Sequence, residues 1–320
     1  MTMTLEETRD LAQAIRNEIG KAVVGQDAII DHLLIGLIAQ GHILLEGPPG
    51  TAKTFLAQCF SRATGLDFGR IQFTPDLLPG DIVGSNLFNF QTSQFTLTRG
   101  PIFCDLLLAD EINRTPPKTQ AALLEAMQER KVTLDGETHH LPPHFMVVAT
   151  QNPIENQGVY PLPEAQLDRF LFKLLVPYPS EEQEIAIVTR FGERSGAPHA
   201  EDYGISAVAD AAGISAAQAA VRSVILSPDV AAYIVALVRA TRETSDISSG
   251  ASPRAAVVIA QAARARAALH GRDYVLPDDV KALATASLRH RLKLSAAAEI
   301  EGKQVEDLVA GLIEQTEAPR

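Results

Sequence analysis

The most constraining feature of this sequence is the stretch Leu44–Thr54, which reads LLEGPPGTAKT. It follows a short apolar run and leads into the helical pattern KTFLAQCFSRA, and a strand, a glycine-rich loop and a helix in that order are typical of phosphate-binding loops. Gly47 and Gly50 can adopt the positive φ angles that turn successive backbone N–H groups toward one anion. The residues expected to surround the phosphates are Gly47, Pro48, Pro49, Gly50, Thr51, Ala52, Lys53 and Thr54.

Two residues of this loop are expected to act directly on a nucleotide. Lys53 would place its ammonium group against the β- and γ-phosphates, and Thr54 would give a hydroxyl ligand to Mg²⁺. The usual pattern has glycine before the lysine, whereas this chain has Ala52. A left-handed backbone at Ala52 would cost about 1–2 kcal/mol, less than several hydrogen bonds to phosphate at about 1.5–3 kcal/mol each. The alternative is a strand-to-helix turn that binds no ligand.

The first half of the chain predicts an α/β fold with a parallel sheet. Short apolar runs alternate with helical patterns such as Lys118–Glu129, as they do in βαβ units with buried strands. Helical spacing also covers Leu5–Gln40. The four expected strands lie within His42–Gly47, Asp105–Glu111, Phe145–Asn152 and Phe170–Val176.

The second half predicts a separate, all-helical domain. No strand pattern follows Pro179, and three helices begin with proline at their first position, at Pro228, Pro253 and Pro277. Residues 195–220 are rich in Gly, Ala, Ser and Asp and indicate a loop with weak helix. We therefore divide the chain into an α/β nucleotide-binding core at 1–178 and a helical domain at 179–320.

Polar side chains at the ends of two expected strands suit the chemistry of phosphoryl transfer. Asp110 and Glu111 follow an apolar run directly, and ligands of open α/β sheets bind at the carboxyl ends of strands. Asp110 would bind Mg²⁺ and Glu111 would polarise the attacking water. Asn152, at the next strand end, would lie between the γ-phosphate and that water. The alternatives are a solvated acidic turn and a simple Asn-Pro turn.

Two arginines also suit stabilisation of charge on a transferred phosphate. Arg169 ends the helical stretch LPEAQLDRF, and Arg254 begins a helix of the second domain. Either guanidinium would act within its own chain or on the site of a neighbouring chain. For Arg169, a surface ion pair with Asp168 or Glu164 is the ordinary alternative.

Charge and composition narrow the classes of partner. The net charge of −11 disfavours a surface built to bind nucleic acid, which needs basic patches. The only two cysteines, Cys59 and Cys104, lie in apolar runs and are expected to be buried thiols. The N-terminal residues do not resemble a secretory signal, and no apolar run approaches the roughly 18 residues of a membrane span. We expect a cytoplasmic protein without membrane insertion.

The segment Arg130–Leu141 predicts a β-hairpin that projects from the sheet. Asp135-Gly136 at the centre of its alternating pattern is a strong signal for a two-residue hairpin turn. Related projecting hairpins would suit a motor or loader that acts on DNA. Here Lys131 is accompanied by Asp135 and Glu137, so the hairpin makes a poor electrostatic funnel for nucleic acid.

The ordered set GPPGTAKT, LLLADEINR, ATQNP, LPEAQLDRF and GASPR resembles the AAA+ ATPases, and within them the MoxR family, over roughly Leu5–Ile313. Alanine before the lysine is what this resemblance leads one to expect. It also implies a helix-2 insertion within and after Gln72–Phe88, and a pre-sensor role for the Asp135-Gly136 hairpin. By position, the resemblance assigns Lys53 and Thr54 to Walker A, Asp110 and Glu111 to Walker B, Asn152 to sensor 1, Arg169 to the arginine finger, Arg254 to sensor 2, and Val24, Gly25 and Gln26 to the adenine pocket.

The resemblance further implies how the protein works in the cell. It implies ATP and Mg²⁺ as ligands and a homo-oligomeric ring, typically a hexamer, in which Arg169 completes the neighbouring site. Whether Arg254 acts on its own site or a neighbour's is open, and Arg114 is a second candidate for action on a neighbour. Family members are chaperone-like ATPases that mature or insert cofactors, often metals, into protein clients with a von Willebrand factor A (VWA) domain partner. The alternatives are a DNA-dependent motor or loader and a nucleotide-gated scaffold without meaningful turnover.

Overall fold

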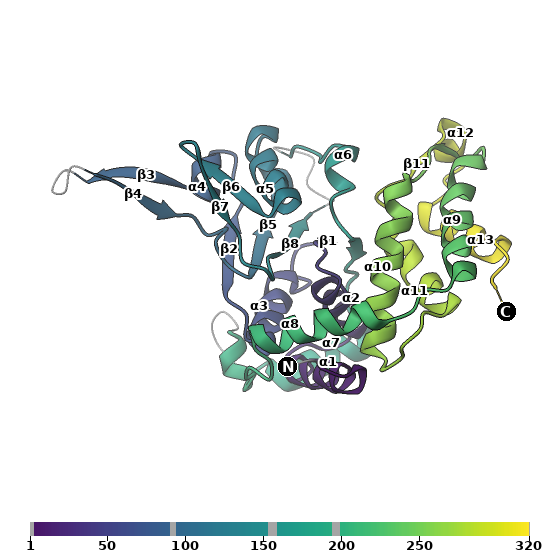
Figure 1. The fold of residues 1–320 in the computed structure, drawn as a ribbon, viewed down its shortest axis with the longest axis horizontal. Helices are drawn as coiled ribbons and strands as arrows, with labels where there is room; N and C mark the ends of the chain where they lie inside the picture. The colour runs from purple at the N-terminus through teal and green to yellow at the C-terminus, as the bar shows by residue number, and fades with distance from the viewer. Residues whose placement is uncertain (1–2, 90–93, 153–158, 194–198, 320) are drawn as a thin grey trace.

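The computed structural model describes residues 3–89, 94–152, 159–193 and 199–319 (Figure 1). Its centre is a five-stranded sheet in the order β2-β5-β8-β1-β9, in which all neighbours pair in parallel. All carboxyl ends of the strands therefore lie at one edge of the sheet. The strands are β1 (Ile43–Glu46), β2 (Phe68–Gln72), β5 (Leu106–Asp110), β8 (Met146–Gln151) and β9 (Phe172–Leu175).

Helices cover both faces of this sheet, because alternate residues of its buried strands point to opposite sides. Leu106 and Leu108 pack in one hydrophobic cluster, with residues of α1, α2 and α3. Leu107 and Ala109 pack in a second cluster, with residues of α5. These helices are α1 (Leu5–Ile19), α2 (Asp27–Ile38), α3 (Lys53–Thr64) and α5 (Pro117–Glu129), and the shorter elements of the core are α4 (Pro79–Val83), η1 (Ile112–Arg114) and α6 (Glu164–Leu167).

The two cysteines are buried within this core, as the sequence predicts. Cys59 lies on α3 and Cys104 lies just before β5, and neither forms a disulfide. Burial raises the pKa of each thiol to about 12. Both side chains therefore stay protonated and serve as small apolar groups.

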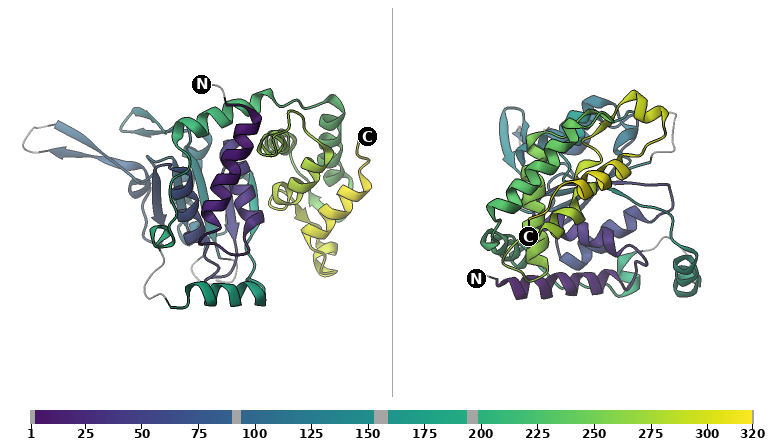
Figure 2. Two further views of the ribbon diagram at one scale, coloured as in Figure 1. Left: turned by 90° about the horizontal axis from the view of Figure 1, so that it is seen from below. Right: turned by 90° about the vertical axis from the view of Figure 1, so that its right-hand side faces the viewer.

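Two antiparallel hairpins interrupt the parallel array. The predicted one is confirmed: β6 (Lys131–Leu134) and β7 (Glu137–His140) are joined by a two-residue turn with positive φ at Asp135 and Gly136. The other hairpin consists of β3 (Gly84–Asn89) and β4 (Gln94–Arg99), follows α4, and projects far from the sheet in both views (Figure 1; Figure 2, left). It lies where the family resemblance implies an insertion.

The C-terminal part is mainly helical, as predicted, with one small addition. A two-stranded antiparallel ribbon joins β10 (Ile247–Ser249) to β11 (Lys293–Leu294) among the helices. The predicted weak helix is α8 (Ala211–Ala220), which packs against α1 and α2 and leads toward the lid helices (Figure 1). The other elements are α7 (Glu181–Phe191), η2 (Ala200–Tyr203), η3 (Val221–Ser223), α9 (Pro228–Glu243), α10 (Pro253–Leu269), α11 (Pro277–Leu288), α12 (Ala296–Ile300) and α13 (Val305–Gln315).

The division of the chain at residues 178 and 179 stays a prediction. The last core strand, β9, ends just before it, and the helices α9 to α13 form a group of their own at one side of the sheet (Figure 1). Among the helices of the described segments, none combines the length and apolarity needed to cross a bilayer.

Candidate functional site

The loop between β1 and α3 has the backbone of a phosphate-binding turn. Gly50 has φ +81°, and Ala52 has φ +58° and ψ +24°, so the alanine does adopt the left-handed conformation that costs about 1–2 kcal/mol. Gly47 differs from the prediction, because its φ is not positive. A Cβ at Gly47 would instead lie 2.3 Å from the carbonyl oxygen of Val176, so the close approach of the chain after β9 requires glycine there.

Side chains within and beside the loop fix this backbone. The Lys53 ammonium donates to the carbonyl oxygens of Gly47 and Pro48, at 2.7 Å each. The Thr51 hydroxyl donates to the Pro48 carbonyl at 2.9 Å, and the amide of Gln26 donates to the Thr51 carbonyl at 3.1 Å. Gln26 is therefore brought to the loop, as an adenine-pocket residue would be.

Asp110 lies at the end of β5 within reach of this loop. Its Oδ2 accepts from the Thr54 hydroxyl at 3.0 Å and from Arg70 at 2.9 Å, and its Oδ1 accepts from the Thr150 hydroxyl at 2.7 Å. Only 7% of Asp110 is exposed. A carboxylate and a hydroxyl held this close are the oxygen ligands that Mg²⁺ takes, together with phosphate oxygens, so Thr54 and Asp110 fit the ion.

Glu111 follows Asp110 in a strained conformation, with φ +58° and ψ +49°. Its backbone N–H donates to the Thr150 hydroxyl at 2.9 Å. Its Oε2 accepts from Gln72 at 2.8 Å and pairs with Arg114 Nε at 3.1 Å. A left-handed non-glycine residue costs of order 1–3 kcal/mol, and such strain clusters at functional sites. The left-handed conformation of Glu111 turns the chain directly after the buried carboxylate of Asp110.

Residues at the ends of four neighbouring strands, β2, β5, β8 and β1, meet around one cavity of about 520 Å³. Asn152, at the end of β8, is 7% exposed and lies on this cavity with Glu111. The pKa of the Lys53 ammonium is lower than usual, because burial lowers it by more than the charges of Asp110 and Glu111 raise it. The lining residues are Pro49, Gly50, Thr51, Ala52, Lys53, Thr54, Phe55, Arg70, Gln72, Asp110, Glu111, Thr150, Gln151 and Asn152.

Sequence reasoning missed four polar residues of this cavity: Arg70, Gln72, Thr150 and Gln151. Arg70 and Gln72 lie on β2, which has no continuous apolar run, and their spacing of two residues was the available signal. Thr150 precedes the predicted strand end by two residues and hydrogen-bonds both Asp110 and the backbone of Glu111.

The structure does not bring Arg169 and Arg254 to this cavity. Both line a cleft of about 200 Å³ that also includes Gly41 and His42, which precede β1. The phosphate loop follows β1 at its other end, and β1 alone spans about 13 Å at 3.3 Å per residue. The two arginines and the phosphate loop therefore lie at opposite edges of one sheet.

Within this arginine cleft, Asp168 pairs with residues of the helical part. The buried Arg291 donates through Nε to the Asp168 carboxylate at 2.7 Å and through Nη2 to the carbonyls of Asp168 and Phe170. Arg254 Nε lies 3.9 Å from Asp168. Among the described residues, no ion pair joins Arg169 to Asp168 or Glu164, and Asp168 pairs instead with Arg254 and Arg291.

The other two residues predicted for the adenine pocket, Val24 and Gly25, do not line the phosphate cavity. Gly25 has φ +74°, and a Cβ there would meet the side chain of Gln183 at 2.2 Å. Val24 is half-buried, and neither Val24 nor Gly25 lines the cavity around Lys53. Their contact with adenine stays a prediction.

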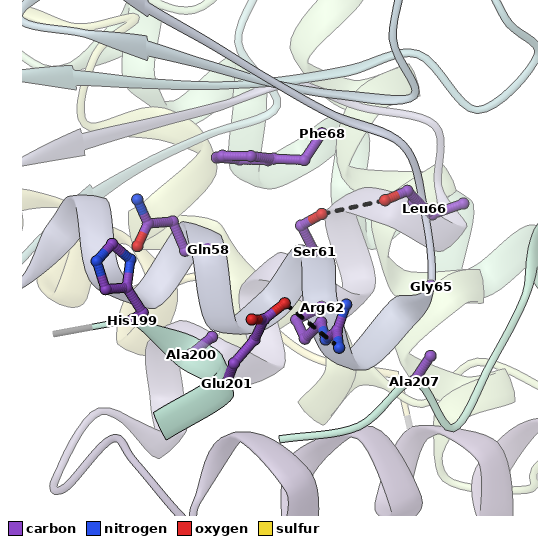
Figure 3. A pocket seen from close by; sticks show the side chains of 10 residues that line it. All are labelled: Gln58, Ser61, Arg62, Gly65, Leu66, Phe68, His199, Ala200, Glu201 and Ala207. Carbon is purple, nitrogen blue, oxygen red and sulfur yellow. Dashed lines mark hydrogen bonds and ion pairs between the residues drawn. The ribbon is translucent and has the colours of Figure 1, made fainter. Parts of the chain in front are cut away.

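Cavity size does not by itself locate the site. Another cavity, of about 600 Å³, lies against the C-terminal half of α3 (Figure 3). Its two charged side chains, Arg62 and Glu201, pair with each other at 3.5 Å. Phe68 and His199 form other parts of its wall. Among the described residues that line it there is no lysine and no pair of adjacent carboxylates, so the cavity around Lys53 is the better candidate for binding phosphate.

The fold and the site together define a class of protein. A parallel sheet of this strand order carries a phosphate loop after β1, adjacent carboxylates at the end of β5 and an asparagine at the end of β8 between them. With a helical domain after the last strand, this is the architecture of an AAA+ ATPase.

Comparisons with known proteins narrow the class to a family. Residues 42–172 match the model "ATPase family associated with various cellular activities (AAA)", and residues 239–312 match the AAA lid domain. Chaperone MoxR1 of Mycobacterium tuberculosis is 45% identical, over 90% of this chain and 77% of its own length. Protein MoxR of Methylorubrum extorquens is 30% identical, over 98% and 97%. The chain belongs to the MoxR family of AAA+ ATPases.

Two further matches extend over nearly the whole length. YeaC of Bacillus subtilis is 43% identical, over 97% of this chain and 95% of its own. A crystal structure of a protein from Cytophaga hutchinsonii superimposes with a TM-score of 0.90 at 39% identity, over 99% of this chain and 97% of that one. Both the α/β core and the helical lid are therefore shared with these relatives.

Proposed function

We propose that this protein hydrolyses ATP to ADP and phosphate with Mg²⁺, and that a ring of its subunits uses the turnover to remodel protein clients. The observation that carries the proposal is the meeting of Lys53, Thr54, Asp110, Glu111 and Asn152 around one cavity. These residues lie at the start of α3 and at the ends of β5 and β8, and phosphoryl transfer needs all of their functional groups at one place.

Each residue has one task in the proposed reaction. Loop amides and the Lys53 ammonium bind the phosphates, and Thr54 and Asp110 hold Mg²⁺, which neutralises charge developing on the phosphate oxygens. Glu111 orients and polarises the attacking water, and Asn152 positions that water against the γ-phosphate.

The direct test is the Glu111→Gln variant. It should retain ATP binding in calorimetry while turnover falls at least about 100-fold, because a general base contributes at least that much. Glu125→Gln, an exposed glutamate on α5, is the matched control and should keep full turnover. Undiminished turnover in Glu111→Gln would show that Glu111 does not have this role. A wild-type protein that binds no ATP would overturn the whole proposal.

We propose further that Arg169 and Arg254 serve the site of a neighbouring subunit. Their cleft lies at the edge of the sheet opposite to the phosphate loop, so neither reaches the γ-phosphate of its own chain. A ring places such a cleft against the next subunit's cavity, and hexamers are the usual size in the resembling family. Arg114 is the weaker candidate, because it already pairs with Glu111 of its own chain at 3.1 Å.

The client and the partner are proposed from family membership. A relative named as a chaperone supports remodelling of proteins, and the resemblance adds cofactor or metal-centre maturation and a separate VWA-domain chain in the cytoplasm. Glu111→Gln protein held in ATP should retain client and partner in a pull-down. The same protein in ADP is the control, and equal capture in both nucleotides would contradict nucleotide-dependent binding.

No described feature favours the DNA motor. Arg130, at the base of the β6–β7 hairpin, donates to the carbonyls of Gln40 at 2.7 Å and Pro143 at 3.2 Å and so points into the protein. Lys131 lies 3.9 Å from Glu129. Stimulation of ATP turnover by DNA, steeply reduced by salt, would reverse this judgement. The scaffold alternative fails if turnover is measurable in the assembled ring.

A further inference from the structure

A cavity of about 380 Å³ lies where the core, α8 and the lid helix α10 meet, away from the nucleotide cavity. The core contributes the end of α2 and the residues before β8, and α10 contributes two side chains from the other side. Figure 1 shows α8 crossing the core toward the lid at this level. The lining residues are Ile38, Ala39, Gln40, Pro143, His144, Ser215, Gln218, Ala219, Val221, Arg222, Gln261 and Arg264.

The charge of this cavity is opposite to that of the chain. The protein has a net charge of −11, yet the lining holds two arginines, Arg222 and Arg264, and no carboxylate. Neither arginine has an ion pair or hydrogen bond within the described residues, and Arg264 Nε is buried without a partner. Burying a donor of a charged group without a partner is costly, so the Nε of Arg264 is matched to an acceptor that the described part of the chain does not provide. Arg222 is exposed and adds a second positive charge to the lining.

A third polar side chain, that of His144, lines the same cavity. His144 is only 5% exposed, and its Nε2 lies 2.9 Å from the Ser215 hydroxyl. Its Nδ1 is buried and has no partner in the described part of the chain. Gln218, in contrast, is occupied, because it donates to the Leu37 carbonyl at 2.8 Å and accepts from Gln40 at 3.1 Å. Gln218 thus holds α8 against α2. The two arginines and His144 are the lining side chains that can still bind a ligand.

A purely structural role for the arginines does not fit their contacts. Positive side chains near a helix C-terminus often hydrogen-bond its last carbonyls, and α2 ends at Ile38. The Leu37 carbonyl already accepts from Gln218, and no described carbonyl accepts from Arg222 or Arg264.

We infer that this cavity binds a small phosphate-bearing anion. Guanidinium groups match the geometry of phosphate oxygens, and here two of them and an imidazole converge from η3, α10 and the loop before β8. The volume lies at the lower end of the range for small-molecule sites, which suits a phosphorylated metabolite rather than a polymer. Because the donors belong to both the core and the lid, the bound anion joins these two parts and restrains their relative motion.

The test is calorimetry of the full-length protein with pyrophosphate and with inorganic phosphate. The phosphate loop is also expected to bind such anions. Each titration is therefore repeated with Lys53→Ala, which weakens anion binding at the loop and leaves the residues of the second cavity unchanged. Binding should persist in Lys53→Ala and weaken about tenfold or more in Arg264→Gln and in Arg222→Gln. Arg222 is exposed, so its substitution leaves the fold intact. Arg239→Gln, an exposed arginine on α9 paired with Glu243, is the control and should bind like wild type.

Two results would overturn the inference independently of the proposed ATPase. Absence of binding in Lys53→Ala, with unchanged binding in both arginine variants, would place the anion at the phosphate loop. Malonate binding as tightly as pyrophosphate, with the same dependence on Arg222 and Arg264, would show a carboxylate site instead.

Discussion

At the scale of single residues, the phosphate loop contains one side chain that strains it. Ala52 holds φ +58° immediately before Lys53, in a backbone region that glycine adopts without cost. The chain therefore gives up stability at the residue where the usual pattern has glycine.

Ala52→Gly should consequently stabilise the protein, against the usual rule for glycine. Relief of about 1–2 kcal/mol of strain exceeds the loss of about 0.4–1 kcal/mol through the more flexible unfolded chain. We expect the free energy of unfolding in urea to rise by roughly 0.5–1 kcal/mol. Ala121→Gly, on the exposed side of α5, is the control and should lose about 1 kcal/mol. A loss of similar size in Ala52→Gly would contradict the left-handed backbone.

A buried histidine should make the fold sensitive to acid. His42 accepts from the Val147 N–H at its Nδ1, at 2.9 Å, and donates from Nε2 to the Met127 carbonyl at 3.1 Å. Burial, aided by the charge of Arg130, lowers the pKa of His42 to about 4. The unfolded chain takes up its proton near pH 6.5 and the folded chain does not, so stability falls as pH drops below 6.5.

Between pH 6.5 and pH 5, proton uptake by His42 in the unfolded chain should lower the free energy of unfolding by about 2 kcal/mol, at about 1.36 kcal/mol per pH unit. Urea titrations of wild type and His42→Asn at both pH values would measure it. The variant should lose the part of the acid dependence that His42 causes and retain the part caused by other groups, such as His290, whose pKa burial lowers well below its usual value. Equal acid dependence in both proteins would show that His42 is not buried in its neutral form.

The residues that meet in the candidate site could be predicted from the sequence better than their backbone conformation. Lys53, Asp110 and Glu111 could be assigned because their chemistry follows from residue type and from position beside an apolar run. The positive φ of Glu111 and the close approach at Gly47 could not, because both depend on contacts with distant segments, Thr150 and Val176.

At the scale of elements, two residues that follow α11 tie the lid to the segment that precedes β9. His290 donates through Nε2 to the Phe170 carbonyl at 3.0 Å, and Arg291 binds the Asp168 carboxylate and two nearby carbonyls. The Arg291 side chain is 2% exposed. This tie joins the lid to the chain segment that carries Arg169.

Arg291→Met should therefore lower the free energy of unfolding by much more than a substitution at the surface does. It removes the ion pair and leaves buried carbonyls without a donor, at a cost of at least about 2 kcal/mol. Thermal unfolding would measure the loss. Arg239→Met, which breaks only the exposed pair with Glu243, should stay within about 0.5 kcal/mol of wild type. Equal effects in the two variants would show that Arg291 contributes no more than a surface pair.

The elements predicted from sequence were those with their own apolar signal. The strands β1, β5, β8 and β9 are nearly continuous apolar runs because helices cover both faces. The edge strand β2 reads FGRIQ and has only Ile71 fully buried, so tertiary pairing with β5 makes it a strand. Arg70 and Gln72 were missed for the same reason.

At the scale of the whole molecule, the separation of the phosphate loop from Arg169 makes a prediction about mixed assemblies. Glu111→Gln and Arg169→Ala should each be inactive alone. Mixed one to one, a subunit with intact Glu111 meets an intact Arg169 next to it at about a quarter of positions, so about a quarter of wild-type turnover should return.

The control mixes Glu111→Gln with Lys53→Ala. Both changes damage the same cavity, and no arrangement of neighbours restores an intact site, so turnover should stay at the level of either variant. Failure of the Arg169→Ala mixture to regain activity, in assemblies shown to exchange subunits, would show that Arg169 does not complete a neighbour's cavity.

In the proposed ring, the opposite placement of the arginine cleft and the phosphate loop on one sheet would give each subunit one side that contributes Arg169 and another side that receives a neighbour's arginine. Contacts in such an assembly are head-to-tail, so the ring has a direction. A substitution of Arg169 would then inactivate the cavity of the next subunit, while a substitution of Lys53 would inactivate only the cavity of its own subunit. In rings that mix variant and wild-type subunits, a substitution of Arg169 would therefore also inactivate wild-type subunits.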